Sequence, residues 1–541
     1  MSNQNRAIVA QANDLQDGEM KQVKVGETDV LLAHVEGKYF ATGAMCTHYG
    51  APLVEGALHG SRVICPWHHA CFNVTNGDLE EPCALDALPS YTVEQQGNNI
   101  LVSVPTEQTD RRILKPVTIT GQDTRVFVIL GGGAAGQAAL EELRRQDFAG
   151  RIVLVTREQR LPYDRTNLSK DYLDGNAGED ALPLRPDVFY QEHNIELLRE
   201  HEVAQVDAQS RAITFADGNT LRYDALLLAS GSKPRTLNVP GSDLQNVFTL
   251  RSVEDADKII AVTQEIKRAV VVGASFIGME AAASLTRRKV AVTVVAPESV
   301  PFETTLGERI GKVFQGMHEE MGVTFRLQSK IVRIEGEGKV EAVVLESGER
   351  IATEAVVIGV GVQPLVDYVR GVSPQKDGSV MVDASLRVTE GLFAAGDIAT
   401  FPYKLTGENI RVEHWRLAEQ HGRTAAHAML GQDKSYDGVP FFWTAHFGQA
   451  LHYIGNTKQW DEIIFWGEPE KRGKAANEGD PAMHEFIAFF VKHGKVVAVA
   501  GMNHDTETAA IEELMRTDKL PAPDALRTRV DVVSMLKSGT P

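Results

Sequence analysis

Two short boxes that each pair a cysteine with a histidine constrain this chain most. Cys-Thr-His occupies residues 46–48 and Cys-Pro-Trp-His occupies residues 65–68, with sixteen residues between His48 and Cys65. Two thiolates and two imidazoles suit a [2Fe–2S] centre in which two histidines replace two cysteines on one iron. Zinc takes the same ligands, but its sites usually separate a cysteine pair from a histidine pair. The spacing therefore favours the iron–sulfur centre, with zinc as the alternative.

The stretch around these boxes resembles a Rieske ferredoxin domain. The resemblance covers residues 46–91 and includes CTHYGAPL, CPWHHACFN, an Asn-Gly turn and the ending Leu-Pro-Ser-Tyr. It implies that Cys46 and Cys65 ligate one iron and that His48 and His68 ligate the other.

Three residues depart from the pattern of the Rieske proteins of cytochrome complexes. Ala51 and Trp67 stand where those proteins carry a disulfide, and Ala70 stands where they carry a serine that donates to a cluster sulfur. Fewer donors to the sulfurs stabilise the reduced form less. We therefore expect a reduction potential toward the low end of the Rieske range.

Bulk composition excludes several classes of protein. The 541 residues suggest three or four domains. The formal net charge of −18 argues against nucleic-acid binding. The chain contains no run of eighteen apolar residues, so no membrane span is predicted. The start of the chain has no signal-peptide pattern. All four cysteines lie between residues 46 and 83, so Cys71 and Cys83 are expected to be reduced thiols in a cytoplasmic protein.

A first dinucleotide fingerprint follows an apolar strand expected at residues 125–130. The strand runs into GGGAAG, a helical stretch and a second strand at residues 152–155. In this frame Gly131 allows the tight turn, Gly133 lets the backbone approach a pyrophosphate, and Gly136 lets helix and strand pack closely. Glu158 follows the second strand at the distance expected of an acid that binds the ribose.

A second fingerprint follows the strand expected at residues 269–272. Gly273 and Gly278 take glycine positions, and Ser275 replaces the middle glycine. Glu298 comes twenty residues after Gly278, as expected of an acid that binds the ribose. No arginine or lysine occurs between residues 290 and 307. A 2′-phosphate would need such a cation, so NADH is favoured over NADPH.

Two nucleotide folds, the first interrupted by the second, resemble the two-dinucleotide flavoprotein reductases. The segments PYDR, LSK, LFAAGD and EHW carry this resemblance further. It implies that a helix follows the AAGD segment and points its N-terminus at FAD, and that a flavin-side helix starts near EHW. It also implies that Lys170 and Glu280 pair near flavin N5, where a surface ion pair is the alternative, and that Trp415 lies beside the flavin, where a core position is the alternative. The other residues implied in FAD binding are Arg165, Gly396, Asp397, Glu413 and His414.

The predicted fold is multidomain. An all-β Rieske domain is followed by two α/β Rossmann-like domains, one inserted in the other, and by an α+β reductase C-terminal domain. The predicted boundaries are 1–105 for the Rieske domain, 106–122 for a short linker, 123–245 and 376–435 for the FAD-binding domain, 246–375 for the NAD-binding domain and 436–541 for the C-terminal domain.

The whole chain resembles the Rieske-containing branch of the apoptosis-inducing-factor-like family. The resemblance implies an enzyme in which NADH reduces FAD, and FAD passes single electrons to the cluster and on to an unidentified acceptor, such as an oxygenase, a cytochrome or a ferredoxin. Disulfide reductases and fused nitrite reductases need further cysteines, and residues 84–541 contain none. A redox-gated interaction protein stays open as the alternative. The oligomeric state is not predicted.

Overall fold

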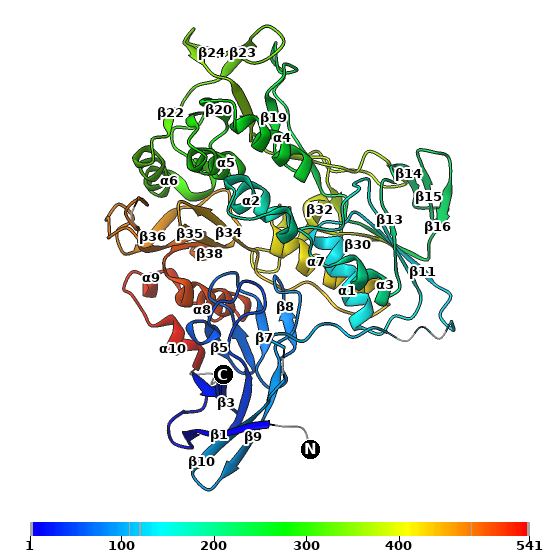
Figure 1. The fold of residues 1–541 in the computed structure, drawn as a ribbon, viewed down its shortest axis with the longest axis vertical. Coiled ribbons are helices and arrows are strands. Elements are labelled where there is room, and N and C mark those ends of the chain that lie inside the picture. Colours follow the sequence, from blue (N-terminus) through cyan, green and yellow to red (C-terminus); the bar gives the residue numbers. More distant parts are fainter. Residues whose placement is uncertain (1–3, 108, 118, 120, 478, 538–541) are drawn as a thin grey trace.

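The computed structural model describes residues 4–107, 109–117, 119, 121–477 and 479–537. The first three residues of the predicted Rieske domain and residues 108, 118 and 120 of the predicted linker lie outside this range. Figure 1 shows the N-terminal domain in blue at one end of the molecule, beneath the orange and red C-terminal domain, with the green inserted domain at the other end.

The N-terminal domain is built of strands, as predicted. Its elements are β1 (Gln4–Gln11), β2 (Glu19–Val25), β3 (Thr28–Val35), β4 (Lys38–Gly43), η1 (Leu53–Glu55), β5 (Ala57–His59), β6 (Arg62–Ile64), β7 (Cys71–Asn73), β8 (Leu79–Glu81), β9 (Ser90–Gln96) and β10 (Asn99–Pro105). The strands form one sheet in the order β1-β10-β9-β4-β3-β2 and a smaller sheet in the order β5-β6-β7-β8. The two cysteine–histidine boxes lie in the loops β4–β5 and β6–β7.

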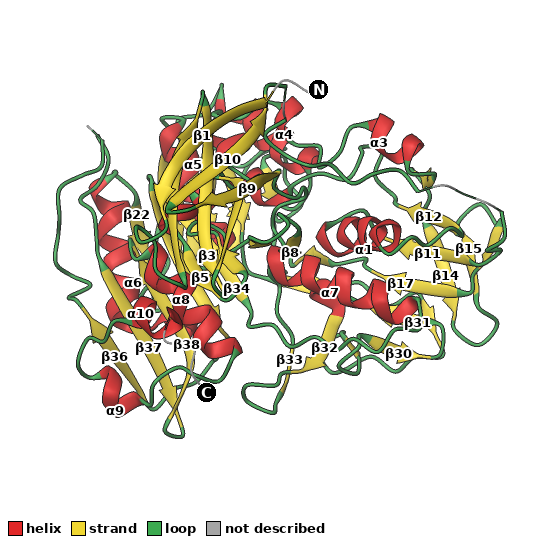
Figure 2. Ribbon diagram, turned by 90° about the horizontal axis from the view of Figure 1, so that it is seen from below, coloured by secondary structure: helices red, strands yellow, loops and turns green. Residues whose placement is uncertain are grey.

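A parallel sheet with flanking helices follows. Its elements are β11 (Val126–Leu130), α1 (Ala134–Arg145), β12 (Arg151–Val155), α3 (Asp187–Glu192), β13 (Ile195–Leu198), β17 (Ala225–Leu228), β30 (Arg387–Thr389), β31 (Leu392–Ala394) and α7 (Trp415–Met429). The order is β13-β12-β11-β17-β31-β30, and only β30 runs antiparallel among these strands. Figure 2 shows α1 and α7 side by side. They pack so closely that a Cβ on Gly422 would lie 2.1 Å from the Ala135 carbonyl oxygen.

The inserted domain repeats this plan. Its elements are β19 (Val247–Thr249), α4 (Val253–Thr263), β20 (Arg268–Val272), α5 (Phe276–Arg287), β21 (Ala291–Val295), α6 (Glu303–Glu320), β22 (Thr324–Arg326) and β26 (Ala355–Ile358). The sheet β19-β26-β20-β21-β22 is parallel throughout. In both halves the last fingerprint glycine is required by packing. A Cβ on Gly136 would lie 1.9 Å from the Gly131 carbonyl oxygen, and one on Gly278 would lie 2.2 Å from that of Gly273.

The remaining elements of residues 123–435 are short. They are η2 (Arg165–Ser169), α2 (Asp171–Asp174), η3 (Glu179–Ala181), β14 (Val203–Asp207), β15 (Ala212–Phe215), β16 (Thr220–Arg222), β18 (Ser232–Pro234), β23 (Ile331–Glu335), β24 (Ala342–Leu345), β25 (Arg350–Ala352), β27 (Val362–Pro364), β28 (Val369–Arg370), β29 (Val380–Met381), η4 (Gly396–Ile398), β32 (Ala399–Pro402) and β33 (Asn409–Ile410). β28 already pairs with β14 of the first half. The chain therefore pairs with the first half again before residue 375, which is the predicted end of the inserted domain.

One expectation about this region is wrong. The AAGD segment is not followed by a long helix that points at a ligand, because η4 is a single turn and β32 comes directly after it. In this half, two helices begin at the wall of the ligand cavity. They are α1 and α7, and α7 begins at Trp415. The start of a helix near the EHW segment is confirmed.

The C-terminal domain is an antiparallel sheet covered by helices. Its elements are β34 (Phe441–His446), β35 (Gln449–Gly455), β36 (Glu462–Trp466), β37 (Phe486–Lys492), β38 (Lys495–Met502), α8 (Asp505–Arg516), α9 (Pro523–Leu526) and α10 (Val532–Lys537). The strand order is β34-β35-β38-β37-β36. None of the helices in the described part of the chain combines the length and the apolar character that a membrane crossing requires.

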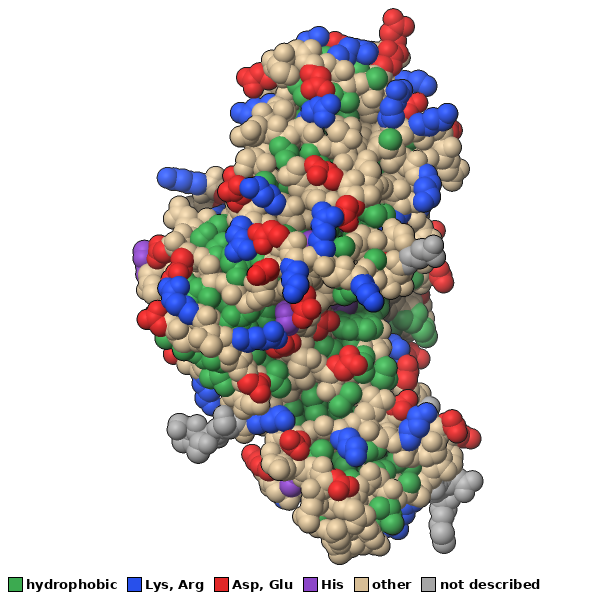
Figure 3. Space-filling view, turned by 90° about the vertical axis from the view of Figure 1, so that its left-hand side faces the viewer, with side chains coloured by type: hydrophobic (Ala, Val, Ile, Leu, Met, Phe, Trp, Pro, Cys, Tyr) green, Lys and Arg blue, Asp and Glu red, His purple; other side chains and the backbone are tan. Residues whose placement is uncertain are grey.

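The N-terminal and C-terminal domains share one hydrophobic core. Ala57, Ile64 and Cys71 of the small N-terminal sheet lie in a single buried cluster with Phe441 of β34 and Leu514 of α8. Figure 3 shows hydrophobic side chains gathered at the waist between the N-terminal domain and the rest of the molecule. The N-terminal domain is therefore packed onto the body of the protein and is not carried loosely on its linker.

Candidate redox site

The two cysteine–histidine loops have the same backbone shape. In the first, the Cys46 amide donates to the Ala51 carbonyl at 2.8 Å; in the second, the Cys65 amide donates to the Ala70 carbonyl at the same distance. The fourth residue after each cysteine has a positive φ, 77° at Gly50 and 55° at His69. These matched turns bring the two boxes face to face.

The candidate ligands lie in two pairs. The Cys46 and Cys65 thiols are both buried and within hydrogen-bonding reach of each other. The ring centroids of His48 and His68 are 4.9 Å apart. Nδ1 of His48 is buried without a hydrogen-bond partner, as a nitrogen that binds a metal would be. One thiol pair and one imidazole pair fit the two irons of a Rieske cluster.

The second histidine of the CPWHH sequence is turned away from this site. The His69 ring is fully buried and stacks on Phe441 with a centroid distance of 3.9 Å. Its Nδ1 contacts the Glu512 carboxylate. Of the two adjacent histidines, His68 is therefore the one whose ring lies beside that of His48.

Beside the boxes lies a cavity of about 980 Å³ between the two nucleotide-binding halves and the C-terminal domain. Its wall includes Gly131, Gly133, Glu158, Arg165, Lys170, Ser275, Glu280, Gly396, Asp397, Glu413, His414, Trp415 and Trp443. The structure thus brings most of the sequence-predicted residues to one cavity. Gly136, Gly273 and Gly278 lie under it as packing glycines, and Glu298 lies outside the lining.

The wall of this cavity fits a bound dinucleotide. A Cβ on Gly133 would meet no protein atom nearer than Arg165 Nε at 4.0 Å, so the protein itself does not require glycine there. Three polar atoms of the lining are buried without a partner, Ser232 Oγ, Tyr368 Oη and His414 Nδ1. Buried polar groups normally find partners. These atoms therefore fit a ligand such as FAD.

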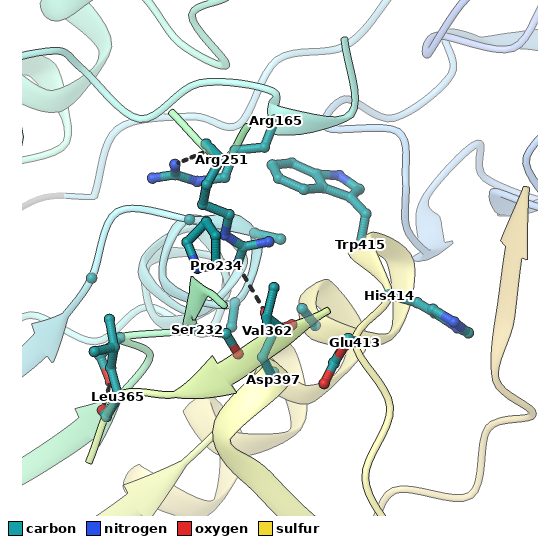
Figure 4. Close-up of a pocket in the computed structure, with 18 of the residues that line it drawn as sticks. Arg165, Ser232, Pro234, Arg251, Val362, Leu365, Asp397, Glu413, His414 and Trp415 are labelled. Carbon is teal, nitrogen blue, oxygen red and sulfur yellow. Dashed lines mark hydrogen bonds and ion pairs between the residues drawn. The ribbon is translucent and has the colours of Figure 1, made fainter. Parts of the chain in front are cut away.

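Two ion pairs lie on the side of the cavity that the FAD-binding half forms. Glu158 accepts from Arg165 Nη2 and from the Tyr163 hydroxyl, both at 2.6 Å. Burial raises the pKa of Glu158, but Arg165 and Tyr163 outweigh this effect and the net pKa is lowered. Asp397 Oδ2 accepts from Arg251 Nη2 at 2.8 Å. Figure 4 shows Arg251 and Asp397 joined inside the cavity, with Trp415 and Arg165 beside them.

Sequence reasoning missed Arg251 and Arg411. Arg251 precedes α4 of the inserted domain, and Arg411 Nη1 donates to the backbone carbonyl of Asp397 at 3.1 Å. Neither lies in a motif, so only a fold that brings these segments together reveals them. Trp415 is half-buried, because it packs on the core of the first half and also lines the cavity.

The ion pair of Lys170 and Glu280 is not on the surface. The Glu280 side chain is only 4% exposed, and its Oε2 accepts from Lys170 Nζ at 2.9 Å. The same oxygen accepts from the Ser169 hydroxyl at 2.5 Å, and Oε1 accepts from the Thr444 hydroxyl at 2.7 Å. An ion pair at the cavity wall whose carboxylate is buried disfavours the surface alternative.

Comparisons with known proteins identify the families of the three parts of the chain. Residues 125–422 match the family of pyridine nucleotide-disulphide oxidoreductases, residues 5–92 the Rieske [2Fe-2S] domain, and residues 441–537 the reductase C-terminal domain. The chain is 38% identical to apoptosis-inducing factor 3 of Mus musculus over 99% of this chain and 87% of that protein.

Two further similarities cover the reductase part of the chain. One is to the ferredoxin–NAD(+) reductase subunit of the benzene 1,2-dioxygenase system of Pseudomonas putida, at 30% identity over 74% of this chain and 94% of that protein. The other is to the crystal structure of the ferredoxin reductase for the CYP199A2 system from Rhodopseudomonas palustris. That structure is 29% identical with a TM-score of 0.71, over 76% of this chain and 100% of that chain.

Proposed function

Because this chain belongs to the pyridine nucleotide-disulphide oxidoreductase family and carries a Rieske domain, we propose that it is an NADH-dependent flavoprotein oxidoreductase of the ferredoxin-reductase type. It takes electrons from NADH through FAD to its own Rieske cluster and on to a one-electron acceptor. The flavin and the cluster supply the redox chemistry, and the protein binds and orients them.

One side chain carries this proposal, because it touches both sites. Trp443 lines the large cavity, and its ring lies 4.4 Å from that of His68, measured between centroids. A single aromatic ring therefore lies between the cavity and a candidate cluster ligand. On the cluster side, the Tyr49 ring contacts that of His48 at a centroid distance of 4.1 Å, and its hydroxyl donates to Asp164 at 3.1 Å. These contacts support transfer of electrons within one chain.

The cysteine pattern supports the same route. The family name includes disulfide chemistry, which needs a cysteine pair beside the flavin. Residues 84–541 contain no cysteine, and Cys71 and Cys83 are buried away from the cavity lining. The electrons of a reduced flavin therefore need another exit, and the cluster is the other redox centre that this sequence encodes.

The proposed work of the individual residues follows from their places. Gly131, Gly133 and the N-terminus of α1 would hold the pyrophosphate of FAD, with Glu158, Arg165, Gly396 and Asp397 at the rest of the cofactor. Lys170, Glu280, Glu413, His414 and Trp415 would surround the reacting ring. Gly273, Ser275, Gly278 and Glu298 would hold NADH. These roles, and the domain boundaries given above, are part of the proposal.

The test is anaerobic mixing with NADH in a stopped-flow instrument, followed by EPR. We expect the flavin to bleach first and the cluster second, at a rate independent of protein concentration. Trp443→Leu should slow only the second phase, and Trp443→Phe should retain most of its rate. A cluster that stays oxidised beside a fully reduced flavin, or a second phase that depends on concentration, contradicts the proposed route.

The preference for NADH gives a second prediction. Oε2 of Glu298 is buried without a partner, which suits an acceptor for a ribose hydroxyl. The 2′-phosphate of NADPH would meet this carboxylate, at a cost of about 1–3 kcal/mol. The value of kcat/KM should therefore be lower for NADPH by about 5- to 150-fold. Glu298→Gln should narrow the gap, whereas equal values for the two nucleotides in the unmodified protein would refute the Glu298 assignment.

The acceptor is proposed by class only. Relatives are named as reductases of a dioxygenase system and of a cytochrome system, so an oxygenase component, a cytochrome or another ferredoxin is the acceptor we propose. The four cysteines, all within the described residues, are unpaired. Reduced thiols support a cytoplasmic location.

A redox-gated interaction protein is the second candidate. The name of the relative that covers 99% of this chain, apoptosis-inducing factor 3, favours it. Turnover separates the two functions. An enzyme reduces a soluble one-electron acceptor continuously at the expense of NADH, whereas a gated interaction protein is reduced once and then changes its shape or its partners.

A further inference from the structure

A buried chain of polar side chains leads away from the cavity. It starts at Glu280 Oε1, which accepts from the Thr444 hydroxyl at 2.7 Å. Thr444 Oγ1 lies 2.9 Å from His446 Nε2, and His446 Nδ1 lies 3.2 Å from His318 Nε2. Of these residues, only the cavity-lining Glu280 has a role in the proposed function.

The chain is sealed from solvent. Thr444 and His318 are fully buried, and His446 is 1% exposed. Apolar rings of Phe302, Phe314 and Phe447 surround the two imidazoles. Burial lowers the pKa of His446 to about 3 and lowers that of His318 well below its usual value. Both imidazoles are therefore neutral, and each carries one N–H.

Counting protons shows that the chain has two directions. Thr444 has one hydroxyl proton, so it donates either to Glu280 or to His446. If Glu280 is ionised, Thr444 donates to it, His446 Nε2–H donates to Thr444, and His318 Nε2–H donates to His446 Nδ1. If Glu280 is protonated on Oε1, every bond reverses, and His318 carries its proton on Nδ1. The state of Glu280 therefore sets the tautomer of both histidines.

The far end of the chain is open. Nδ1 of His318 is buried and has no hydrogen-bond partner among the described residues. In the reversed state this atom is a donor, and in the first state it is an acceptor. Among the described residues this nitrogen is therefore the end of the chain at which no protein group accepts or donates the next hydrogen bond.

We propose that Glu280, Thr444, His446 and His318 form a reversible proton relay that balances the charge of the cavity during turnover. This inference rests on the proposed function. Hydride transfer from NADH adds one negative charge beside Glu280. One proton then enters at His318 Nδ1. Each hydrogen-bonded proton of the chain moves to its acceptor, and Glu280 becomes protonated.

The return step balances the cycle. When two electrons leave, one at a time, for the cluster and the one-electron acceptor, the hydrogen that came as hydride leaves as a proton. Glu280 gives its own proton back through the relay. One proton is therefore taken up and two are released, so that each NADH yields NAD⁺, two electrons and one proton.

The charged surroundings of Glu280 suit such a switch. Lys170 is the charged group that contacts it, from the segment between η2 and α2, and Ser169 donates to the same oxygen. Thr444 of β34 contacts it, and His446 of the same strand contacts Thr444. The carboxylate therefore has an ammonium group on its Oε2 side and the relay on its Oε1 side.

The chain itself is tested in the oxidised holoprotein by NMR of ¹⁵N-labelled histidine. We expect Nε2–H tautomers for His446 and His318. In Glu280→Gln, the amide oxygen must face the donors Lys170 and Ser169, so its NH₂ faces Thr444 and both histidines should change to Nδ1–H. Unchanged tautomers in this variant would overturn the inference, whatever the protein does with NADH.

Proton movement is tested by infrared difference spectra of the reduced minus the oxidised holoprotein. A band of a protonated carboxyl should appear on reduction and be absent in Glu280→Gln. In Thr444→Val the band should form about tenfold more slowly or worse, and Thr444→Ser should restore the rate. Thr508→Val is the matched control, because it removes an equivalent buried bond to His452 that lies outside the relay.

Two results would overturn the relay. They are a reduced protein without the carboxyl band, and a band that forms in Thr444→Val as fast as in the unmodified protein. Failure of the proposed function looks different, because NADH would then not bleach the flavin at all. Electrochemical reduction can still be used in that case, so the relay is judged separately.

Discussion

Replacing His68 with Ala should remove the iron–sulfur centre and stop the delivery of electrons to any one-electron acceptor, while NADH still reduces the flavin at a near-normal rate. In this variant one iron of the [2Fe–2S] cluster loses one of its two protein ligands. The hydride step involves only the cavity. The unmodified protein should contain about two irons per chain and show the rhombic EPR signal of a Rieske centre when reduced.

The neighbouring histidine is the sharpest control. His69 lies next to His68 in sequence, but its Nδ1 contacts Glu512 and its ring stacks on Phe441. His69→Gln should therefore retain the EPR signal. His34→Ala, which removes a histidine of the large N-terminal sheet, should retain it as well. One zinc per chain without an EPR signal, or a signal that survives His68→Ala, would refute the cluster assignment.

Local patterns made much of the architecture predictable. Strand, glycine turn and helix occur together at both fingerprints, and the packing of Gly136 and Gly278 follows from spacing alone. The boxes predict their ligands because each supplies a thiol and an imidazole at short range. In each case the residues that define the feature are close in sequence, so their geometry is set by a few bonds.

Features that depend on distant segments were not predictable. The AAGD segment is followed by a single helical turn, and the helix that faces the cavity starts later, at Trp415. Arg251 reaches Asp397 from the other nucleotide fold. A linker joins the N-terminal domain to the first nucleotide fold, but the N-terminal domain shares its hydrophobic core with the last domain. Only tertiary packing determines such partners.

The packing of the Rieske domain depends on a buried arginine. Arg416 of α7 is 2% exposed, and its Nη1 donates to Glu512 Oε1 at 2.7 Å. Its Nε donates to the Pro82 carbonyl at 2.8 Å and its Nη2 to the His69 carbonyl at 2.9 Å. One guanidinium thus joins the β6–β7 loop and the segment after β8 to Glu512 of α8. Burial alone would raise the pKa of Glu512, but Arg416 and His69 outweigh it, so the pKa is lowered and the carboxylate is ionised.

Arg416→Met should therefore be one of the most destabilising single changes in the protein. Removing one partner of a buried ion pair leaves the other charge uncompensated, at a cost of about 3–5 kcal/mol. Two carbonyls of the N-terminal domain lose their donor at the same time. We expect a lower Tm, faster proteolysis within residues 65–83, and slower reduction of the cluster than of the flavin.

Two matched variants show whether burial is the cause. Arg309→Met breaks a similar Arg–Glu pair, with Glu470, whose side chains are 50% and 52% exposed, and it should cost only about 0–1 kcal/mol. The double change Arg416→Met with Glu512→Gln removes the uncompensated charge, so it should recover part of the stability that Arg416→Met loses. If Arg416→Met is no less stable than Arg309→Met in chemical denaturation, the N-terminal domain is held by its shared apolar core alone. In that case a fixed distance between flavin and cluster would rest on Phe441 and its neighbours.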